Sequence, residues 1–166
     1  MNYFKDIQTP VGLLKLIATE KGLAAVLWEG ESLERVKIDR GIEAKNNPLL
    51  LETEKQLSEY FQKQRTVFNL PLDFTGTEFQ KKVWELLLTI PFGETRTYGD
   101  IARQLGDIKA VRAVGAANGK NPISIIAPCH RVIGTSGKLT GFAGGLTNKA
   151  FLLRLEQSRT TPTLWD

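Results

Sequence analysis

Cysteine and histidine are scarce in this chain of 166 residues, which has one of each, and methionine also occurs once. A single cysteine cannot form a disulfide within the chain, and this favours a reducing setting. One cysteine and one histidine also fall short of the four ligands of a structural zinc site, so we expect no metal and no cofactor. No apolar run approaches the roughly 20 residues that cross a bilayer, and the start, MNYFKDIQTP, lacks the basic-then-apolar pattern of a secretory signal. We therefore expect a cytoplasmic protein without membrane contacts.

The charge is only mildly positive. Lysine and arginine number 22 against 18 acidic residues, which gives a formal net charge of +4. This balance permits contact with phosphates, but it is equally typical of an ordinary solvated surface. The chain has no Lys/Arg-rich run, low-complexity tract or internal repeat. Charge alone therefore does not identify a nucleic-acid-binding protein.

The first third of the chain has the pattern of a β-sheet. Short apolar-rich segments are separated by the turn sequences TPVG and EKG, and they predict an antiparallel meander with strands over 3–7, 13–19 and 23–29. Helical spacing and breaker residues predict helices over 31–40 and 49–63. Val67, Phe68 and Leu70 predict one more strand before Pro71. We expect a small α/β domain, an antiparallel sheet with helices, over residues 1–74.

The rest of the chain reads as mostly helical. Thr77 and Gln80 have the spacing of a capping box at the start of a helix that Pro91 stops. The next two helices are predicted over 97–106 and 107–119, joined at Gly106, and a last one over 149–157. Two short helices with a tight glycine turn indicate a helix-turn-helix. We expect a helical domain over 75–166, winged-helix-like, whose tail is loosely held except where Trp165 packs on the body.

The second helix of this pair carries few long side chains. Its surface is made mostly of small residues: Ala110, Ala113, Gly115, Ala116, Ala117 and Gly119. Arg112 is the one long polar side chain in its middle. A helix that reads bases in the major groove normally carries amides and cations. A bare helix can instead pack closely against another helix, or enter a narrow minor groove, and periodicity does not separate these two.

The single cysteine and the single histidine are neighbours, in IIAPCHRVIG. Pro128 suits the first turn of a helix, which would place Cys129 where free backbone N–H groups favour a thiolate. Adjacent side chains on a helix point about 100° apart, so direct contact between the thiol and His130 is not required by their adjacency. An imidazole that accepts a thiol proton needs an orienting group, and Glu156 is the candidate. The residues alone thus suggest a Cys-His-Glu nucleophile, although a lone cysteine is commonly a small buried hydrophobe.

The stretch NPISIIAPCHRVIGTSGKLTGFAGG, with Tyr98, RAVGAANG and FLLRLE around it, resembles the O6-alkylguanine-DNA alkyltransferases, also called methylated-DNA–protein-cysteine methyltransferases. The resemblance covers residues 75–157. The first third fits the family's small ribonuclease-H-like domain in order and size but carries no diagnostic motif. The resemblance implies a single-use transferase that moves the alkyl group from O6 of guanine, and more weakly from O4 of thymine, to its own cysteine.

The resemblance also implies roles for individual residues. Cys129 is the alkyl acceptor, His130 removes its proton through a water, and Glu156 orients and charges the imidazole. Asn121 fixes the thiol region, and Tyr98 donates to the departing guanine. The pocket that holds the base through backbone groups corresponds to Val132, Phe142, Ala143 and Gly144. The DNA-binding residues correspond to Arg112, which fills the gap left by a flipped nucleotide, and Ala113, Gly115, Thr97 and Arg96.

The partner implied is duplex DNA with alkylated bases, bound through the minor groove, by a chain that is a monomer in solution with possible cooperative assembly on DNA. Departures from the family pattern are Ala143 and Phe142, where some relatives have Ser and Tyr, and Thr97, where serine is frequent. Two other classes stay open from the residues: a DNA-lesion-binding protein without chemistry, and a cysteine hydrolase built on Cys129, His130 and Glu156.

Overall fold

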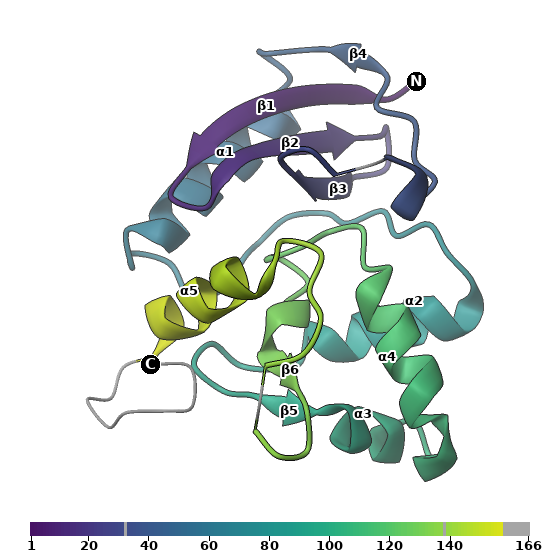
Figure 1. Cartoon of the computed structure of the whole chain (residues 1–166). Coiled ribbons are helices and arrows are strands. Elements are labelled where there is room, and N and C mark those ends of the chain that lie inside the picture. The colour runs from purple at the N-terminus through teal and green to yellow at the C-terminus, as the bar shows by residue number, and fades with distance from the viewer. Residues whose placement is uncertain (32, 138, 158–166) are drawn as a thin grey trace. The chain divides into compact units, whose positions relative to one another are not determined.

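The computed structural model describes residues 1–31, 33–137 and 139–157, and the chain divides into two compact units (Figure 1). The first unit comprises Met1–Thr75 and Pro122–Ser124, and the second comprises Gly76–Asn121 and the chain from Ile125. Pro122–Ser124 therefore belong to the first unit, although the residues on both sides of them in the sequence belong to the second. The prediction for Trp165 and the tail lies outside the described residues.

A four-stranded sheet forms the first unit, in the order β3-β2-β1-β4. Its strands are β1 (Tyr3–Thr9), β2 (Gly12–Ala18), β3 (Leu23–Trp28) and β4 (Ile42–Glu43). The first three pair antiparallel, which confirms the predicted meander, and β4 pairs parallel to β1. Gly12 closes the first hairpin at φ 97°, a conformation that glycine adopts without a Cβ penalty.

The core of this unit lies where the sheet meets a helix. Every residue of β3 is buried, and α1 (Pro48–Phe61) packs on β1 and β2 through Leu50, Leu57 and Tyr60 (Figure 1). Asn47 caps α1 by accepting from the backbone N–H groups of Leu49 and Leu50. Burial of this apolar face, more than intrinsic propensity, stabilises a helix of this length.

Two predictions in this unit are wrong. Among the described residues of the segment 31–40 the only helical element is a 3-10 turn, Leu33–Arg35, and the segment 67–70 contains no strand. The side-chain amide of Gln56 occupies both backbone groups of Asn69, at 2.9 and 3.0 Å, so that backbone has no groups free for a ladder there. The sheet is extended instead by single bridges from Leu72 to Leu23 and from Ile123 to Val26.

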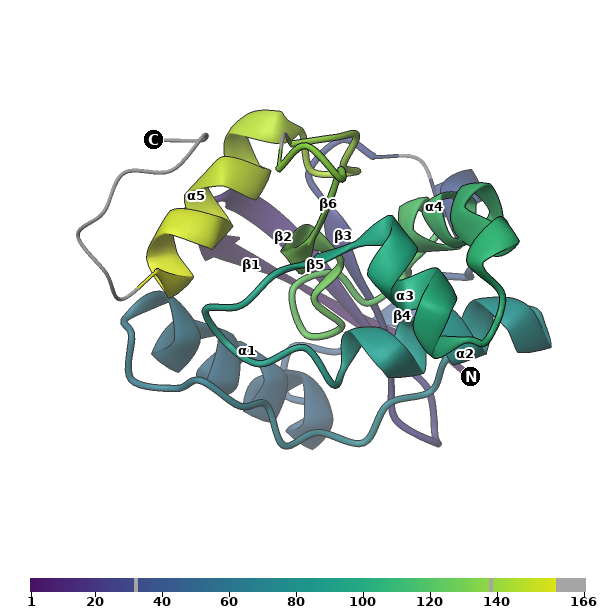
Figure 2. The same ribbon diagram turned by 90° about the horizontal axis from the view of Figure 1, so that it is seen from below.

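The second unit is mostly helical, as predicted, with α2 (Glu78–Leu87), α3 (Tyr98–Gln104), α4 (Val111–Gly119) and α5 (Leu146–Glu156). The capping box of Thr77 and Gln80 is present at the start of α2. Gly106, at φ 86°, turns the chain after α3, and a 3-10 turn at Ile108–Ala110 precedes α4. Figure 2 shows α2, α3 and α4 side by side. None of the helices in the described residues is long and apolar enough to cross a membrane.

A two-residue ladder that the sequence did not predict organises the second unit. Strand β5 (Arg96–Thr97) pairs parallel with β6 (Val132–Ile133). The first residue of α3, Tyr98, follows β5 directly, and β6 directly follows the turn that holds Cys129. The ladder therefore brings the start of the helix-turn-helix beside the thiol region.

Candidate functional site

Cys129 is buried, with 4% of its surface exposed, at the start of a 3-10 turn, Cys129–Arg131. Pro128 was predicted to lie in the first turn of the helix, but it lies just before the 3-10 turn. It is the centre of an inverse γ-turn, at φ −81° and ψ 66°, in which the N–H of Cys129 donates to the carbonyl of Ala127 at 2.8 Å. The predicted position of Cys129 at the start of a short helical turn is confirmed, and its own N–H is already bonded to the Ala127 carbonyl.

Asparagine side chains from the end of α4 and the residues after it hold this turn in place. Asn121 Nδ2 donates to the same Ala127 carbonyl at 2.8 Å, and Asn118 Nδ2 donates to the Cys129 carbonyl at 3.4 Å. Both side chains are buried. Asn118 Oδ1 has no hydrogen-bond partner among the described residues. Buried amides that each bond to a carbonyl fix the path of the backbone around Cys129.

His130 and Glu156 form a buried pair. Nε2 of His130 lies 2.6 Å from Oε2 of Glu156, and the two side chains are 0% and 1% exposed. Glu156 is the last residue of α5, so the helix presents its carboxylate to the Cys129 turn. Nδ1 of His130, the other ring nitrogen, is buried without a hydrogen-bond partner in the described part of the chain.

The pKa shifts of Glu156 and His130 indicate where the proton between their side chains lies. Burial disfavours the charge on Glu156 and by itself would raise its pKa. The charges and hydrogen bonds of His130 and Arg131 outweigh burial and lower the pKa of Glu156 to about 2. Burial lowers the pKa of His130 despite the opposing effect of Glu156. At neutral pH the carboxylate is therefore ionised, and burial favours the neutral form of the imidazole. Nε2–H then donates to Glu156, which leaves Nδ1 as a proton acceptor.

The sequence did not single out Arg131, which completes this cluster. Its Nε and a terminal nitrogen donate to the two oxygens of Glu156 at 2.7 and 3.0 Å, and its other terminal nitrogen donates to the carbonyl of Ile90 at 2.6 Å. The guanidinium also lies 5.8 Å from the centre of the Phe92 ring. This fork holds the carboxylate in one orientation, which in turn fixes the His130 ring.

Lys149, on α5, is a second residue that the sequence did not single out. Its side chain is fully buried, and Nζ donates to the carbonyls of Val132 at 2.7 Å and Thr140 at 3.4 Å. Burial lowers the pKa of Lys149 to about 8, while the charge of Cys129 acts in the opposite direction. A buried ammonium thus lies within electrostatic range of the thiol.

Of the predicted pocket residues, Val132 contacts this lysine, and Phe142, Ala143 and Gly144 lie in the segment just before α5. The carbonyl of Val132 accepts from Lys149, and Phe142 accepts from the backbone N–H of Gly145 in a turn at 3.0 Å. Ala143 is exposed and Gly144 is half-buried, with its carbonyl bonded to Asn148. Tyr98, half-buried at the start of α3, meets the hydroxyl of Thr140 at 2.6 Å.

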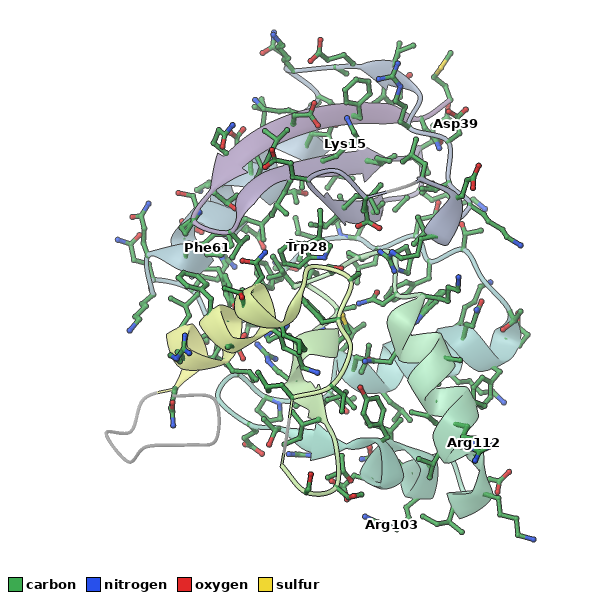
Figure 3. The ribbon with its side chains drawn as sticks, viewed as in Figure 1. Lys15, Trp28, Asp39, Phe61, Arg103 and Arg112 are labelled. Atoms are coloured by element: carbon green, nitrogen blue, oxygen red, sulfur yellow. The ribbon has the colours of Figure 1, made fainter. Side chains whose placement is uncertain are left out.

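The predicted DNA-binding residues lie on α4 and just before α3. Arg112 and Ala113 are exposed and Gly115 is half-buried, and Figure 3 shows Arg112 on α4. Arg112 has no ion pair with any described residue. The Thr97 hydroxyl accepts from the N–H of Asp100 as the cap of α3, and Arg96 pairs with Glu94 at 3.1 Å. The N–H of Thr97 and the cation of Arg103 lower the pKa of Asp100 against the effect of burial.

The burial of individual residues shows which side of α4 is packed against the protein and which side is exposed. Val114, Ala117 and Asn118 face the protein, where the indole N–H of Trp84 donates to the Ala117 carbonyl at 2.8 Å. The other small residues point outward, with Ala113, Ala116 and Gly119 exposed. The bare surface is therefore not packed against a neighbouring helix within the described residues. It is open to a partner.

Two family models match the chain. Residues 2–74 match the ribonuclease-like domain of 6-O-methylguanine DNA methyltransferase, and residues 78–158 match its DNA binding domain. A methylated-DNA–protein-cysteine methyltransferase of Methanosarcina acetivorans is 48% identical, over 94% of this chain and 99% of the relative. One of Mycobacterium tuberculosis is 47% identical over 100% of both chains.

Solved structures agree with these matches. The crystal structure of Mycobacterium tuberculosis O6-methylguanine methyltransferase is similar at a TM-score of 0.84 and 44% identity, covering 99% of this chain and 98% of that one. The structure of the same organism's OGT in complex with DNA is similar at a TM-score of 0.82 and 46% identity, over 93% and 92% of the two chains. With both halves of the chain matched, and relatives aligned along nearly their whole length, this protein belongs to the 6-O-methylguanine DNA methyltransferase family, the methylated-DNA–protein-cysteine methyltransferases.

Proposed function

We propose that this protein repairs DNA by a single transfer of an alkyl group from O6-alkylguanine in duplex DNA to Cys129, with weaker action on O4-alkylthymine. The observation that carries the proposal is the buried thiol next to a His130–Glu156 pair with a 2.6 Å contact, in which Nδ1 of the imidazole has no partner among the described residues. We also propose that residues 1–74 and 75–166 act as the two domains, the second carrying the reaction.

The imidazole supplies the base in this scheme. Nδ1 of His130 takes the thiol proton through a bridging water, and the ionised Glu156 stabilises the imidazolium that forms. Asn121 and Asn118 hold the backbone of the thiol turn while the charge develops. A thiolate, unlike a thiol, is an effective nucleophile toward saturated carbon.

The atoms balance in one displacement. A bond forms between Sγ and the alkyl carbon as the bond from that carbon to O6 breaks, and the bonding electron pair stays on the guanine. The proton lost by the thiol ends on the guanine, and the hydroxyl of Tyr98 donates a hydrogen bond to the base as it departs. A thioether is chemically stable, so each chain reacts once.

Access to the alkyl group requires the base to leave the stack, at a cost of a few kcal/mol. The exposed small residues of α4 suit a narrow minor groove, where bulky side chains do not fit. Arg112 suits the gap left by the extruded nucleotide, because a planar guanidinium can stack there and bond to the unpaired partner. Val132, Phe142, Ala143 and Gly144 form the wall that receives the base in this proposal.

The test is the intact mass of the protein after mixing with duplex DNA that carries one O6-methylguanine. The expected result is a permanent gain of one methyl group per chain, and none in Cys129→Ser, which should still bind the duplex. Binding without any gain in mass would indicate a lesion-binding protein. Release of product with an unchanged protein mass over many turnovers would indicate a hydrolase.

A further inference from the structure

The hydroxyl of Tyr98 has a close partner that the scheme above does not use. Tyr98 Oη lies 2.6 Å from Oγ1 of Thr140, a residue 42 positions later in the chain, and either oxygen can be the donor. Both side chains are half-buried. The contact is short enough to be a firm hydrogen bond between hydroxyl groups.

The backbone of Thr140 also has a hydrogen-bond partner. Its carbonyl accepts from Nζ of Lys149, which also donates to the carbonyl of Val132. Val132 pairs in register with Arg96, and Arg96 lies two residues before Tyr98. A closed ring of contacts thus connects the start of α3, the ladder, α5 and the segment of Thr140. The backbone of Thr140 is thus held by a contact that does not involve the side chain of Tyr98.

A tyrosine hydroxyl has one hydrogen to donate. If that hydrogen is donated to Thr140, none is left for a substrate. If Thr140 donates instead, the hydrogen of Tyr98 is directed elsewhere, and accepting a hydrogen bond makes a hydroxyl a stronger donor. The position of Thr140 therefore decides how well Tyr98 can serve a departing base.

We propose that Thr140 is a positioning residue for alkyl transfer: its hydroxyl donates to the Tyr98 oxygen and directs the single Tyr98 hydrogen at the guanine that leaves. The inference rests on the proposed function, because it assigns Tyr98 its partner at that same site. In the displacement, Tyr98 and Thr140 keep their own protons, and both hydrogen bonds strengthen as negative charge grows on the guanine.

The experiment compares single-turnover transfer from methylated duplex to wild type, Thr140→Val and Thr140→Ser. Valine keeps the shape without the hydroxyl, and we expect transfer to slow by about 3- to 10-fold, which corresponds to one hydrogen bond. Serine keeps the hydroxyl and should restore the rate. In a Tyr98→Phe background, Thr140→Val should cause no further loss, because the threonine acts through the tyrosine.

A second reaction separates this role from a change in the thiol or in folding. Alkylation of Cys129 by iodoacetamide has an iodide leaving group that needs no hydrogen bond, so Thr140→Val should react with it at the wild-type rate. If valine distorts the fold, as the melting temperature would show, Thr140→Ala replaces it in both reactions. Equal slowing with duplex and iodoacetamide, additive losses with Tyr98→Phe, or an unchanged duplex rate would each overturn the proposal.

The proposed function fails in a different way. Wild type that gains no methyl group from the duplex would sink that proposal before any variant is made. A wild type that reacts while Thr140→Val reacts equally fast removes only the role of Thr140.

Discussion

Charged side chains of types that are normally found on surfaces are buried against the turn that holds Cys129. Glu156 is 2% exposed and bonds to both His130 and Arg131, whose side chains are also buried. Removing one member of such a cluster leaves the others unpaired in a medium that solvates charge poorly. The same contacts therefore stabilise the fold and set the basicity of the imidazole.

Glu156→Gln should slow methyl transfer by at least about 10-fold, because it removes a charged hydrogen bond from the imidazole. The charge of Glu156 raises the pKa of His130 against burial, so its loss makes the imidazole a weaker base. The rate falls, and the acid limb of the pH–rate profile, where the imidazole becomes protonated, moves to lower pH. Single-turnover rates across pH, taken well below the melting temperature, measure this shift.

Arg131→Met is the matched control for that variant. It also breaks the buried ion pair, but it leaves the contact between His130 and Glu156 in place. Both variants should lose stability, by about 3–5 kcal/mol for a broken buried pair. An equal shift of the pH–rate profile in both would mean that Glu156 acts through stability and not through the imidazole.

Arg112→Ala should slow repair of duplex DNA by about 10-fold or more, since the gap left by the extruded base would stay unfilled. Reaction with free O6-methylguanine needs no extrusion and should be unchanged. Arg112 is exposed and pairs with no carboxylate in the described residues, so the melting temperature should also hold. Parallel losses on both substrates would argue against this role.

At the scale of elements, α4 has opposite properties on its two sides. One side packs through Val114 and Ala117, and Trp84 bonds to its backbone. The other side exposes small residues and so lets a partner approach the helix backbone closely. The packed side positions the helix, and the exposed side is the one that we propose to face DNA.

Ala116→Gln tests which groove receives α4. A glutamine suits a major groove, where it can bond to adenine, but it is too large for close contact in a narrow minor groove. We expect affinity for duplex DNA to fall, while the melting temperature and the reaction with free base stay unchanged, because Ala116 is exposed and glutamine forms helices well. Equal or tighter binding would favour the major groove. Duplex titrations at fixed salt provide the comparison.

At the scale of the whole molecule, the buried site makes stability depend on acid. The pKa of Glu156 is lowered from 4.5 to about 2, so its contribution is complete above pH 4.5 and is lost as pH falls toward 2. His130 acts in the same direction, because its lowered pKa means that the unfolded chain takes up a proton below about pH 6.5 and the folded chain does not.

Urea unfolding at several pH values measures this dependence. The free energy of unfolding should fall from pH 7 toward pH 3, and Glu156 accounts for about 3 kcal/mol of the full loss down to pH 2. Glu156→Gln should flatten the curve below pH 5, whereas Glu85→Gln, at an exposed site on α2, should not. Identical curves for wild type and Glu156→Gln would contradict the low pKa.

Features that depend on neighbours in the sequence were predictable. Thr77 and Gln80 specify a capping box because both partners lie within one helical turn, and short apolar-rich segments between turn sequences specify β1 to β3. The motif around Cys129 and His130 pointed to the family for the same reason, since its residues are adjacent. The segment 67–70 was misread because the amide that displaces a strand there belongs to Gln56, in α1.

Tertiary structure alone decided the rest of the site. Sequence named Glu156 as a candidate for the imidazole, and only the fold brings it within 2.6 Å of His130. Arginine and lysine are normally surface residues, and nothing in the local sequence indicates that Arg131 and Lys149 are buried. Thr140 meets Tyr98 only because β5 pairs with β6, two residues each, too short to leave a pattern. Local order follows from propensity and periodicity, whereas burial and charge pairing depend on groups that the chain brings together from far apart.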